Sequence, residues 1–359
     1  MCREVSRSIP SIIMSKNTII LIGAIREGKT PICGETMKNQ LFVKRYKELF
    51  DKVITVDTLN WQKRPWVLVK AALTMLFNQK AGVVLSASAS VRYLIHFLYY
   101  VPVNRNVYFW VVGEGLAHAI DNGSFKVKAL NKLKRILIQG QSMVEELKKR
   151  GVVNAQYVPN SKPIIFHPDI QPKNDDFFRF VFLSRVHPDK GIKEIVAASE
   201  ALREKGYSNF SIDFYGNIDP GFKEEFLDII NKHTGVEYKG FLNLLNEDAY
   251  KQLSEYDMML FPTYWAGEAF PGVVLDANIA GVPIIASDWN QNKYVVQDGK
   301  TGFIIPPRDV TALANSMEAF INGEIDLYQM KKECNNYIQQ FEYRTVLSEG
   351  LFREIGLLK

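Results

Sequence analysis

Two acidic residues, Glu268 and Asp276, lie eight positions apart in the run GEAFPGVVLD, around a Phe-Pro-Gly turn and a short apolar segment. Unpaired carboxylates are costly to bury, so acids beside a segment of core composition need a reason. Carboxylates accept hydrogen bonds from hydroxyl groups, each contributing about 1.5–3 kcal/mol when charged. Pro271 and Gly281 suit the start and the stop of a helix. We therefore expect a helix whose free N–H groups near Gly272 bind phosphate while the two acids bind hydroxyl groups.

Arg185 and Lys190 form a second candidate site, in the segment SRVHPDKG (184–191) between a predicted strand and a predicted helix. Arg can bind two oxygens of an anion at once, and Lys acts as a point charge beside them. A helix N-terminus adds free N–H groups and partial positive charge. The pair therefore predicts a diphosphate site. Two solvated cations on a surface turn are the alternative that this segment alone leaves open.

The segment GAIREGKT (23–30) matches the phosphate-binding pattern G-x-x-x-x-G-K-[ST] and follows an apolar strand. A true P-loop continues from its Lys-Thr directly into a helix. Here Pro31 and Gly34 follow, which weakens a continuous helix, and a carboxylate for magnesium is hard to place beyond Asp57. We interpret the segment as a loop that borders a cleft, before a helix at 35–50. A P-loop nucleotide hydrolase or kinase is the alternative function.

The elements that must position these residues are strands alternating with helices. The predicted strands are 17–23, 52–57, 82–87, 106–112, 135–140, 178–184, 211–216, 235–240, 257–262, 282–287 and 302–306. Such alternation indicates parallel sheets with helices on both faces, and eleven or twelve strands fit two sheets better than one. The Pro- and Asn-rich stretch 160–176 is predicted to be the linker. We expect two doubly wound α/β domains that face a cleft, with ligands at the carboxyl ends of the strands.

The composition is ordinary for a soluble globular protein, with 47% hydrophobic and 23% charged residues in a chain of 359. The three cysteines are too few and too scattered to predict a disulfide framework or a zinc cluster. Such a low cysteine content is typical of proteins in a reducing cytosol. The first residues lack the features of a signal peptide, and no apolar run reaches the length of about 18 residues needed to span a membrane. The most apolar segments, 66–77 and 91–103, are interpreted as buried helices.

The charge is unevenly divided, because residues 1–150 carry a net +14 and residues 151–359 a net −9. A basic half could face nucleic acid, anionic lipid or a phosphorylated substrate. No motif of interleaved aromatic and basic residues supports nucleic acid. We expect this half to meet an anionic membrane surface, helped by the two apolar segments. The candidate cations are Lys126, Lys128, Lys132, Lys134 and Arg135.

The segment PTYWAGEAFPGVVLDANIAGVPIIASD (262–288) resembles the donor-site signature of the retaining family-4 (GT4, group 1) glycosyltransferases, which have the GT-B fold. The family pattern is E-x7-E, and Asp276 replaces the second Glu here. Five further segments match in order and spacing, so that the resemblance covers nearly all of residues 155–325: SRVHPDKGI, YVPNSKPI, FYGN, EYKGFL and DGKTGFIIPPRD. In residues 1–150 the resemblance is weak, and GKTPICGETMKN is similar to the first glycine loop of the family.

This resemblance implies two Rossmann-like domains. Residues 1–165 would bind the acceptor, residues 166–342 would bind the nucleotide-sugar donor, and a closing helix at about 343–359 would pack back onto the first domain. Glu268 would contact the donor sugar and Asp276 the ribose hydroxyls. The other implied site residues are Arg185 and Lys190 at the diphosphate, and Phe270, Gly272, Val273, Gly216 and Gly34 around the donor.

His118, in WVVGEGLAH, falls near the place where many family members keep a histidine beside the donor sugar, and Glu114 competes for that role. The implied reaction is retaining transfer from a UDP- or GDP-sugar to a saccharide or lipid-linked acceptor, in cell-surface polysaccharide or glycolipid synthesis. No metal or other cofactor is expected, since no convincing D-x-D follows a strand. The protein would be cytoplasmic or peripheral on the inner face of the membrane. A non-catalytic partner that only binds the acceptor is a further alternative.

Overall fold

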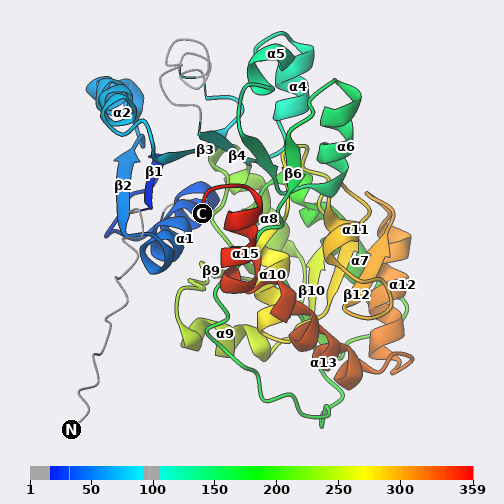
Figure 1. Ribbon diagram of the computed structural model, residues 1–359. Coiled ribbons are helices and arrows are strands. Elements are labelled where there is room, and N and C mark those ends of the chain that lie inside the picture. The colour runs from blue at the N-terminus through cyan, green and yellow to red at the C-terminus, as the bar shows by residue number, and fades with distance from the viewer. Residues whose placement is uncertain (1–16, 32, 92–96, 98–105, 359) are drawn as a thin grey trace, which may run out of the picture.

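The computed structural model describes residues 17–31, 33–91, 97 and 106–358, which form two α/β domains (Figure 1). The first contains a six-stranded parallel sheet in the order β2-β1-β3-β4-β5-β6. Its strands are β1 (Thr18–Gly23), β2 (Lys52–Asp57), β3 (Gly82–Ser88), β4 (Val107–Val112), β5 (Arg135–Ile138) and β6 (Ala155–Tyr157). The short strand β6 is absent from the predicted set, because its three residues, AQY, are half-buried and carry no apolar run.

The second domain repeats the arrangement with the order β12-β11-β10-β7-β8-β9. Its strands are β7 (Phe178–Leu183), β8 (Phe210–Tyr215), β9 (Val236–Gly240), β10 (Met258–Phe261), β11 (Ile284–Ser287) and β12 (Gly302–Ile305). Counted from β7, this is the order 3-2-1-4-5-6 of dinucleotide-binding folds, in which ligands bind where the order reverses, here between β7 and β10. The prediction of two doubly wound parallel-sheet domains is confirmed.

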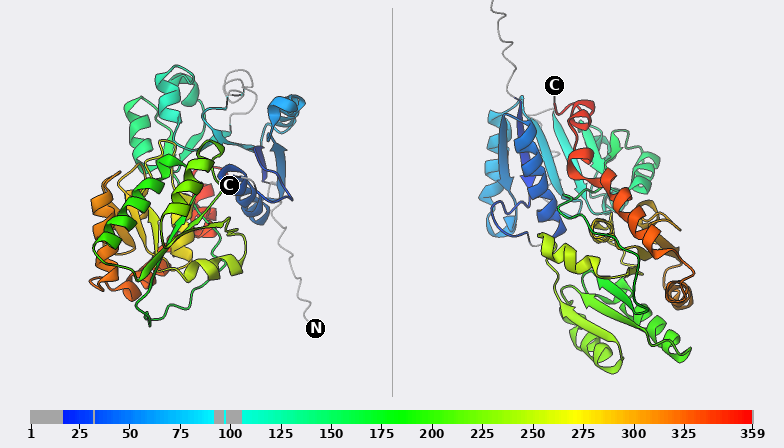
Figure 2. Two further views of the ribbon diagram at one scale, coloured as in Figure 1. Left: turned by 180° about the vertical axis from the view of Figure 1, so that it is seen from behind. Right: turned by 90° about the horizontal axis from the view of Figure 1, so that it is seen from below.

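Helices cover both faces of each sheet, because the strands are apolar on both sides (Figure 2). In the first domain they are α1 (Gly34–Leu49), α2 (Trp66–Phe77), α4 (Leu116–Asp121), α5 (Val127–Leu130) and α6 (Gln141–Lys149). In the second they are α7 (Ile192–Glu204), α8 (Lys223–Lys232), α9 (Glu247–Ser254), α10 (Gly272–Ile279), α11 (Asn292–Val295), α12 (Val310–Ile321) and α13 (Leu327–Tyr337). Short 3-10 turns include Pro188–Lys190 and Ile338–Phe341.

The C-terminal segment returns to the first domain, as the orange-to-red helices of Figure 2 show. It forms two short helices, α14 (Tyr343–Val346) and α15 (Glu349–Glu354), where the sequence predicts one. The side chain of Ser348 caps α15 by accepting a hydrogen bond from the N–H of Leu351, 3.2 Å away, so a new helix starts there. Phe352 and Ile355 are buried in the core formed by α1 and the first sheet.

Helix α2 differs from the buried helix predicted at 66–77. Val67, Ala71 and Met75 pack into the core of the first domain, but the opposite face is apolar and exposed. The side chains of Trp66 and Phe77 are 61% and 78% exposed. The other exposed members of this face are Val69, Leu73 and Leu76. Most of the second apolar segment, 91–103, lies outside the described residues, and among those described no helix is long and apolar enough to cross a membrane.

Candidate active site

A cavity of about 710 Å³ lies between the two domains, where both contribute the carboxyl ends of strands. Gly34 and Gly272 border it as the first residues of α1 and α10, so two helix N-termini face the same space. Glu268 and Phe270 also line it. Because helix N-termini offer free N–H groups and partial positive charge, the cavity favours an anionic ligand.

Lys190 and Glu268 meet in a buried ion pair at the switch point between β7 and β10. Their side chains are only 7% and 14% exposed. Gly191 makes the close approach feasible, since its φ is +81° and a Cβ atom there would lie 2.6 Å from the carbonyl oxygen of Pro262. The hydroxyl of Thr263 contacts the carboxylate of Glu268 at 3.5 Å. The loops after the two strands are therefore held together by this charge pair.

Arg185 lies beside that pair but remains exposed, with its guanidinium stacked 4.7 Å from the ring centroid of Trp265. The backbone N–H of Tyr264 donates to the carbonyl of Asp189 at 2.8 Å, which ties the second loop to the first. The structure thus brings together Arg185, Lys190 and Glu268, which come from segments about 80 residues apart. An exposed Arg stacked on an aromatic ring is suited to binding an anion near Glu268, which lines the cavity.

Asp276 does not offer the free carboxylate that the predicted ribose role needs. The ammonium of Lys162 donates to both of its oxygens, at 2.8 and 2.7 Å, and the hydroxyl of Tyr250 donates to Oδ1 at 2.6 Å. The side chain of Asp276 is 4% exposed. A buried carboxylate needs such partners, and the acid at this position has them within the protein.

Three other residues predicted to surround the sugar donor are Phe270, Val273 and Gly216, and each has a structural role. Phe270 is buried with its ring 5.6 Å from that of Phe341, and Val273 is half-buried against the core of the second domain. Gly216 follows β8 with a φ of +142°, and a Cβ atom there would lie 1.7 Å from the carbonyl oxygen of Ser184. Gly216 therefore lets the end of β8 pack against the start of the Arg185 loop.

His118 is exposed on α4 and, like Glu114, Arg185 and Lys190, is not among the residues that line the cavity. Glu114 lies between β4 and α4 and is half-buried, with Oε1 enclosed and without a hydrogen-bond partner in the described part of the chain. Burial raises the pKa of Glu114 to about 7, and the carboxylates of Glu146 and Glu268 act in the same direction. Of the two candidates, Glu114 faces the charged site.

The raised pKa of Glu114 predicts a pH-dependent stability. The folded protein holds this proton more tightly than the unfolded chain, so the stabilisation from Glu114 is present at low pH and is lost as pH rises through about 7. Glu114→Gln removes the charge and hence this loss. We expect the variant to gain melting temperature over the parent between pH 5 and pH 8. Thermal melts across that range check it, and a constant difference would contradict it.

The GAIREGKT segment does not form a P-loop. Helix α1 begins at Gly34, four residues after Thr30, and Lys29 and Thr30 are both exposed. The carboxylate of Asp57 accepts hydrogen bonds from the backbone N–H groups of Ile25 and Arg26, at 3.0 and 3.1 Å, so it braces this loop. The alternative of a P-loop hydrolase or kinase therefore lacks its structural basis.

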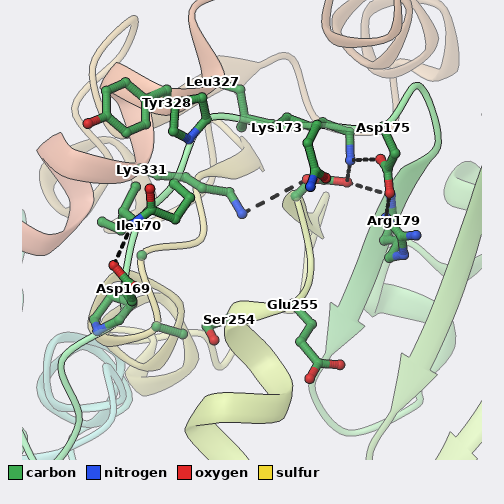
Figure 3. A pocket seen from close by; sticks show the side chains of 17 residues that line it. Asp169, Ile170, Lys173, Asp175, Arg179, Ser254, Glu255, Leu327, Tyr328 and Lys331 are labelled. Atoms are coloured by element: carbon green, nitrogen blue, oxygen red, sulfur yellow. Dashed lines mark hydrogen bonds and ion pairs between the residues drawn. The ribbon is translucent and has the colours of Figure 1, made fainter.

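A second pocket, of about 220 Å³, lies at the linker and is shown in Figure 3. Lys173 bridges Asp175 and Asp257, at 2.7 and 3.0 Å, and the ammonium of Lys331 lies 3.9 Å from Asp257. The backbone N–H of Arg179 also donates to Asp257 at 2.9 Å. These charges neutralise one another, so the pocket anchors the linker to the second domain.

Sequence reasoning missed Lys162 and Tyr250, which line the cavity. Lys162 lies within the predicted linker, and Tyr250 lies on α9 among residues that carry no motif. The available signal was a cation in the segment YVPNSKPI, one of the segments that carry the family resemblance. Among the predicted basic residues, Lys126, Lys128, Lys132 and Lys134 are exposed and Arg135 is half-buried.

Comparison with known proteins gives consistent results. Residues 164–341 match the model of the family described as glycosyl transferases group 1. Over 155 residues the chain is 26% identical to the capsular polysaccharide biosynthesis glycosyltransferase CapM of Staphylococcus aureus. The aligned region covers 42% of this chain and 38% of that protein. It is 25% identical over 215 residues to the UDP-Gal:alpha-D-GlcNAc-diphosphoundecaprenol alpha-1,3-galactosyltransferase of Escherichia coli. This aligned region covers 58% of this chain and 54% of that protein. The chain thus spans about half or less of these relatives.

Solved structures share the fold along nearly the whole chain. Sucrose-phosphate synthase from Thermosynechococcus elongatus superimposes with a TM-score of 0.70 at 16% identity, over 95% of this chain and 99% of that one. HepE of Anabaena in complex with UDP gives a TM-score of 0.66 at 13% identity, over 95% and 100%. The domain that contains residues 164–341 therefore belongs to the family of group 1 glycosyltransferases.

Proposed function

We propose that this protein is a retaining glycosyltransferase that moves a sugar from a nucleoside-diphosphate sugar to a saccharide or lipid-linked acceptor. The observation that carries the proposal is the cluster of Arg185, Lys190 and Glu268 at the switch point between β7 and β10. A cavity of about 710 Å³ has the volume of a small-molecule substrate site. Two helix N-termini and two cations suit a diphosphate, and a carboxylate suits the hydroxyls of a sugar.

In this mechanism the protein stabilises charge that develops on the leaving diphosphate. Arg185 grips the phosphate oxygens, the N–H groups at the start of α10 bind them from the other side, and Lys190 adds fixed positive charge. Glu268 accepts hydrogen bonds from the sugar and holds Lys190 in place. The residues described need no metal for these roles, and we propose a metal-independent reaction.

Names of the relatives support the classes of substrate. The Escherichia coli relative is named for UDP-Gal and a diphosphoundecaprenol-linked acceptor, and the Staphylococcus aureus relative for capsular polysaccharide biosynthesis. The HepE structure contains UDP. We therefore propose a UDP- or GDP-sugar donor, an acceptor on a lipid carrier or a growing saccharide, and a role in polysaccharide or glycolipid assembly at the cytoplasmic face of the membrane.

Binding of the donor can be tested with a panel of UDP-, GDP- and ADP-sugars, each screened for its effect on the melting temperature. A ligand held by the folded state stabilises it by about 2.7 kcal/mol at 100 times its dissociation constant. We expect one nucleotide class to raise the melting temperature by several degrees. The matching labelled donor should then transfer its sugar to a lipid-linked acceptor with retention of the anomeric configuration. No response to any nucleotide would reject the function.

We further propose that the exposed face of α2 docks on an anionic membrane. Trp66 and Phe77 lie at its two ends, and the described residues of the range 58–113 include four Lys and Arg but no Asp or Glu. Helices α2 and α5 contribute Val67 and Leu130 to one core cluster of the first domain, and we propose that the cations in and around α5 reach the same membrane. Apolar side chains beside cations suit an interface with anionic lipid, where each cation contributes about 1 kcal/mol.

Vesicle sedimentation tests this docking surface. We expect the parent to bind phosphatidylglycerol-containing vesicles, to bind phosphatidylcholine vesicles at least 10-fold more weakly, and to dissociate as salt screens the charges. The double change Trp66→Ser and Phe77→Ser should abolish most of the binding, and so should glutamine at Lys126, Lys128, Lys132, Lys134 and Arg135. Phe241→Ser, at an exposed Phe of the second domain, is the matched control. Equal binding to both vesicle types would refute the electrostatic part.

A further inference from the structure

Lys162 lies where the chain passes from the first domain to the second, and its backbone is fixed on both sides. Its N–H donates to the carbonyl of Phe341 and its carbonyl accepts from the N–H of Tyr343, both at 3.0 Å. These two partners belong to the second passage between the domains. The backbone of Lys162 is therefore held in place by the other segment that crosses between the domains, although Lys162 belongs to a segment without regular secondary structure.

The ammonium of Lys162 is directed at Asp276, whose capacity to accept hydrogen bonds is nearly exhausted. An ionised carboxylate has about four lone-pair sites. Two are taken by Lys162 and a third by the hydroxyl of Tyr250, at 2.6 to 2.8 Å. The two adjacent hydroxyls of a ribose would need two acceptors. Asp276 could supply both only if the buried ion pair were broken.

Breaking that pair is unfavourable, because it would leave a charge in a site where Asp276 is 4% and Lys162 is 13% exposed. Removing the partner of a buried charge is strongly destabilising, because the remaining charge has neither its counter-charge nor water around it. Hydrogen bonds from two neutral hydroxyls to Asp276 would leave the ammonium of Lys162 buried without its counter-charge. The pair is therefore expected to persist when a ligand enters.

The persistent pair presents positive charge to the cavity at the start of α10. A Cβ atom on Gly272 would lie 3.5 Å from Cε and 3.9 Å from Nζ of Lys162. Among the described residues, the ammonium has one further polar contact besides Asp276, with the thioether sulfur of Met37 at 3.9 Å, which is a weak acceptor. A donor on Lys162 thus remains for a ligand that binds the N–H groups beginning at Gly272.

We propose that Lys162 binds the diphosphate of the nucleotide as a third cation beside Arg185 and Lys190, and that Asp276 is the positioning residue that holds it. This inference rests on the proposed function, because it assumes a nucleoside-diphosphate donor. Lys162 would approach the phosphates from the linker, whereas the other two cations lie on the loop after β7. The sequence predicts a carboxylate at this end of the cavity that accepts hydrogen bonds from ribose hydroxyls. We propose instead an ammonium that donates hydrogen bonds to phosphate oxygens.

The experiment compares nucleoside diphosphate, monophosphate and free nucleoside of the base that the donor panel identifies, by calorimetric titration. Lys162→Met should weaken diphosphate binding at least 10-fold and leave nucleoside binding unchanged, and Lys162→Arg should restore most of the loss. Asp276→Asn should weaken diphosphate binding less than Lys162→Met does. Because Lys162→Met leaves Asp276 unpaired, the double variant Lys162→Met, Asp276→Asn is measured as well, and it should show the same diphosphate defect with the fold intact.

Lys173→Met is the matched control, since Lys173 is also a linker lysine paired with a buried aspartate, Asp257, outside the cavity. It should leave all three affinities unchanged. Tighter nucleoside binding by Lys162→Met would show that Lys162 blocks a ribose site on Asp276, and unchanged diphosphate binding would show that it touches no phosphate. Either result overturns the inference while the transferase assignment stands. A parent protein that binds none of the three ligands overturns both.

Discussion

Replacing Lys190 with methionine should lower the rate of sugar transfer by at least 100-fold. Lys190 is buried at the end of the loop that carries Arg185, and its ammonium is held by Glu268 before any substrate arrives. Preorganised groups of this kind act where charge develops in the transition state, and removing one typically costs a factor of about 10²–10³ in kcat. The measurement is kcat with saturating donor, together with the dissociation constant of the free nucleoside diphosphate.

The loss of Lys190 also leaves the carboxylate of Glu268 buried without its partner, which lowers stability. The double variant Lys190→Met, Glu268→Gln separates the two effects. Its melting temperature should recover toward that of the parent, because no unpaired charge remains, whereas transfer should stay at least 100-fold reduced. Recovery of transfer along with stability would mean that Lys190 serves only the fold.

The fold was predictable from the sequence because its strands are short apolar runs between turn signals. All eleven predicted strands have counterparts in the two sheets, with ends displaced by at most two residues. The pattern could not show β6, whose three residues are half-buried and are set by pairing with β5. It also could not show the break at Ser348, because capping by a side chain is a local choice that apolar spacing does not encode.

The candidate site was predictable where one motif held both the residue and its environment. Lys190 and Glu268 occur beside the turns that position them, so their approach follows from two adjacent parallel strands. Asp276 shows the limit, because its partner Lys162 lies 114 residues away in a segment without a periodic pattern. His118 and Glu114 could not be ranked either, since four positions along a short turn and helix decide which side chain is half-buried near Glu268 and which is exposed.

Amphipathicity also has a limit as a guide to burial. Helix α2 is apolar on both faces, so its composition resembles a core helix, yet only one face finds a partner among the described residues. Apolar composition shows which side chains favour leaving water, whereas the fold decides which of them do so. An apolar face left exposed by the fold is informative because such patches mark interaction surfaces.

The C-terminal segment gives the clearest case of stability supplied across the domain boundary. Phe352 is fully buried, although it follows the whole second domain in sequence. Its ring centroid lies 5.7 Å from that of Tyr46 and 6.1 Å from that of Phe50, both in the first domain. The hydroxyl of Tyr108 donates to the carbonyl of Ile355 at 3.1 Å, which fixes the end of α15 on the first sheet. The segment therefore completes the core beside α1.

Phe352→Ala should destabilise the protein by about 3–5 kcal/mol, because it removes a buried aromatic ring and leaves a cavity in a tightly packed cluster. The measurement is urea unfolding followed by circular dichroism, with limited proteolysis to show which domain opens. We expect cleavage to begin in the first domain, since that is where the ring packs. Phe241→Ala, at a Phe that is 64% exposed, should change the midpoint little. If Phe352→Ala instead unfolds at the same urea concentration as the parent, α15 contributes nothing to the first domain, and the segment serves only as a strap between the two.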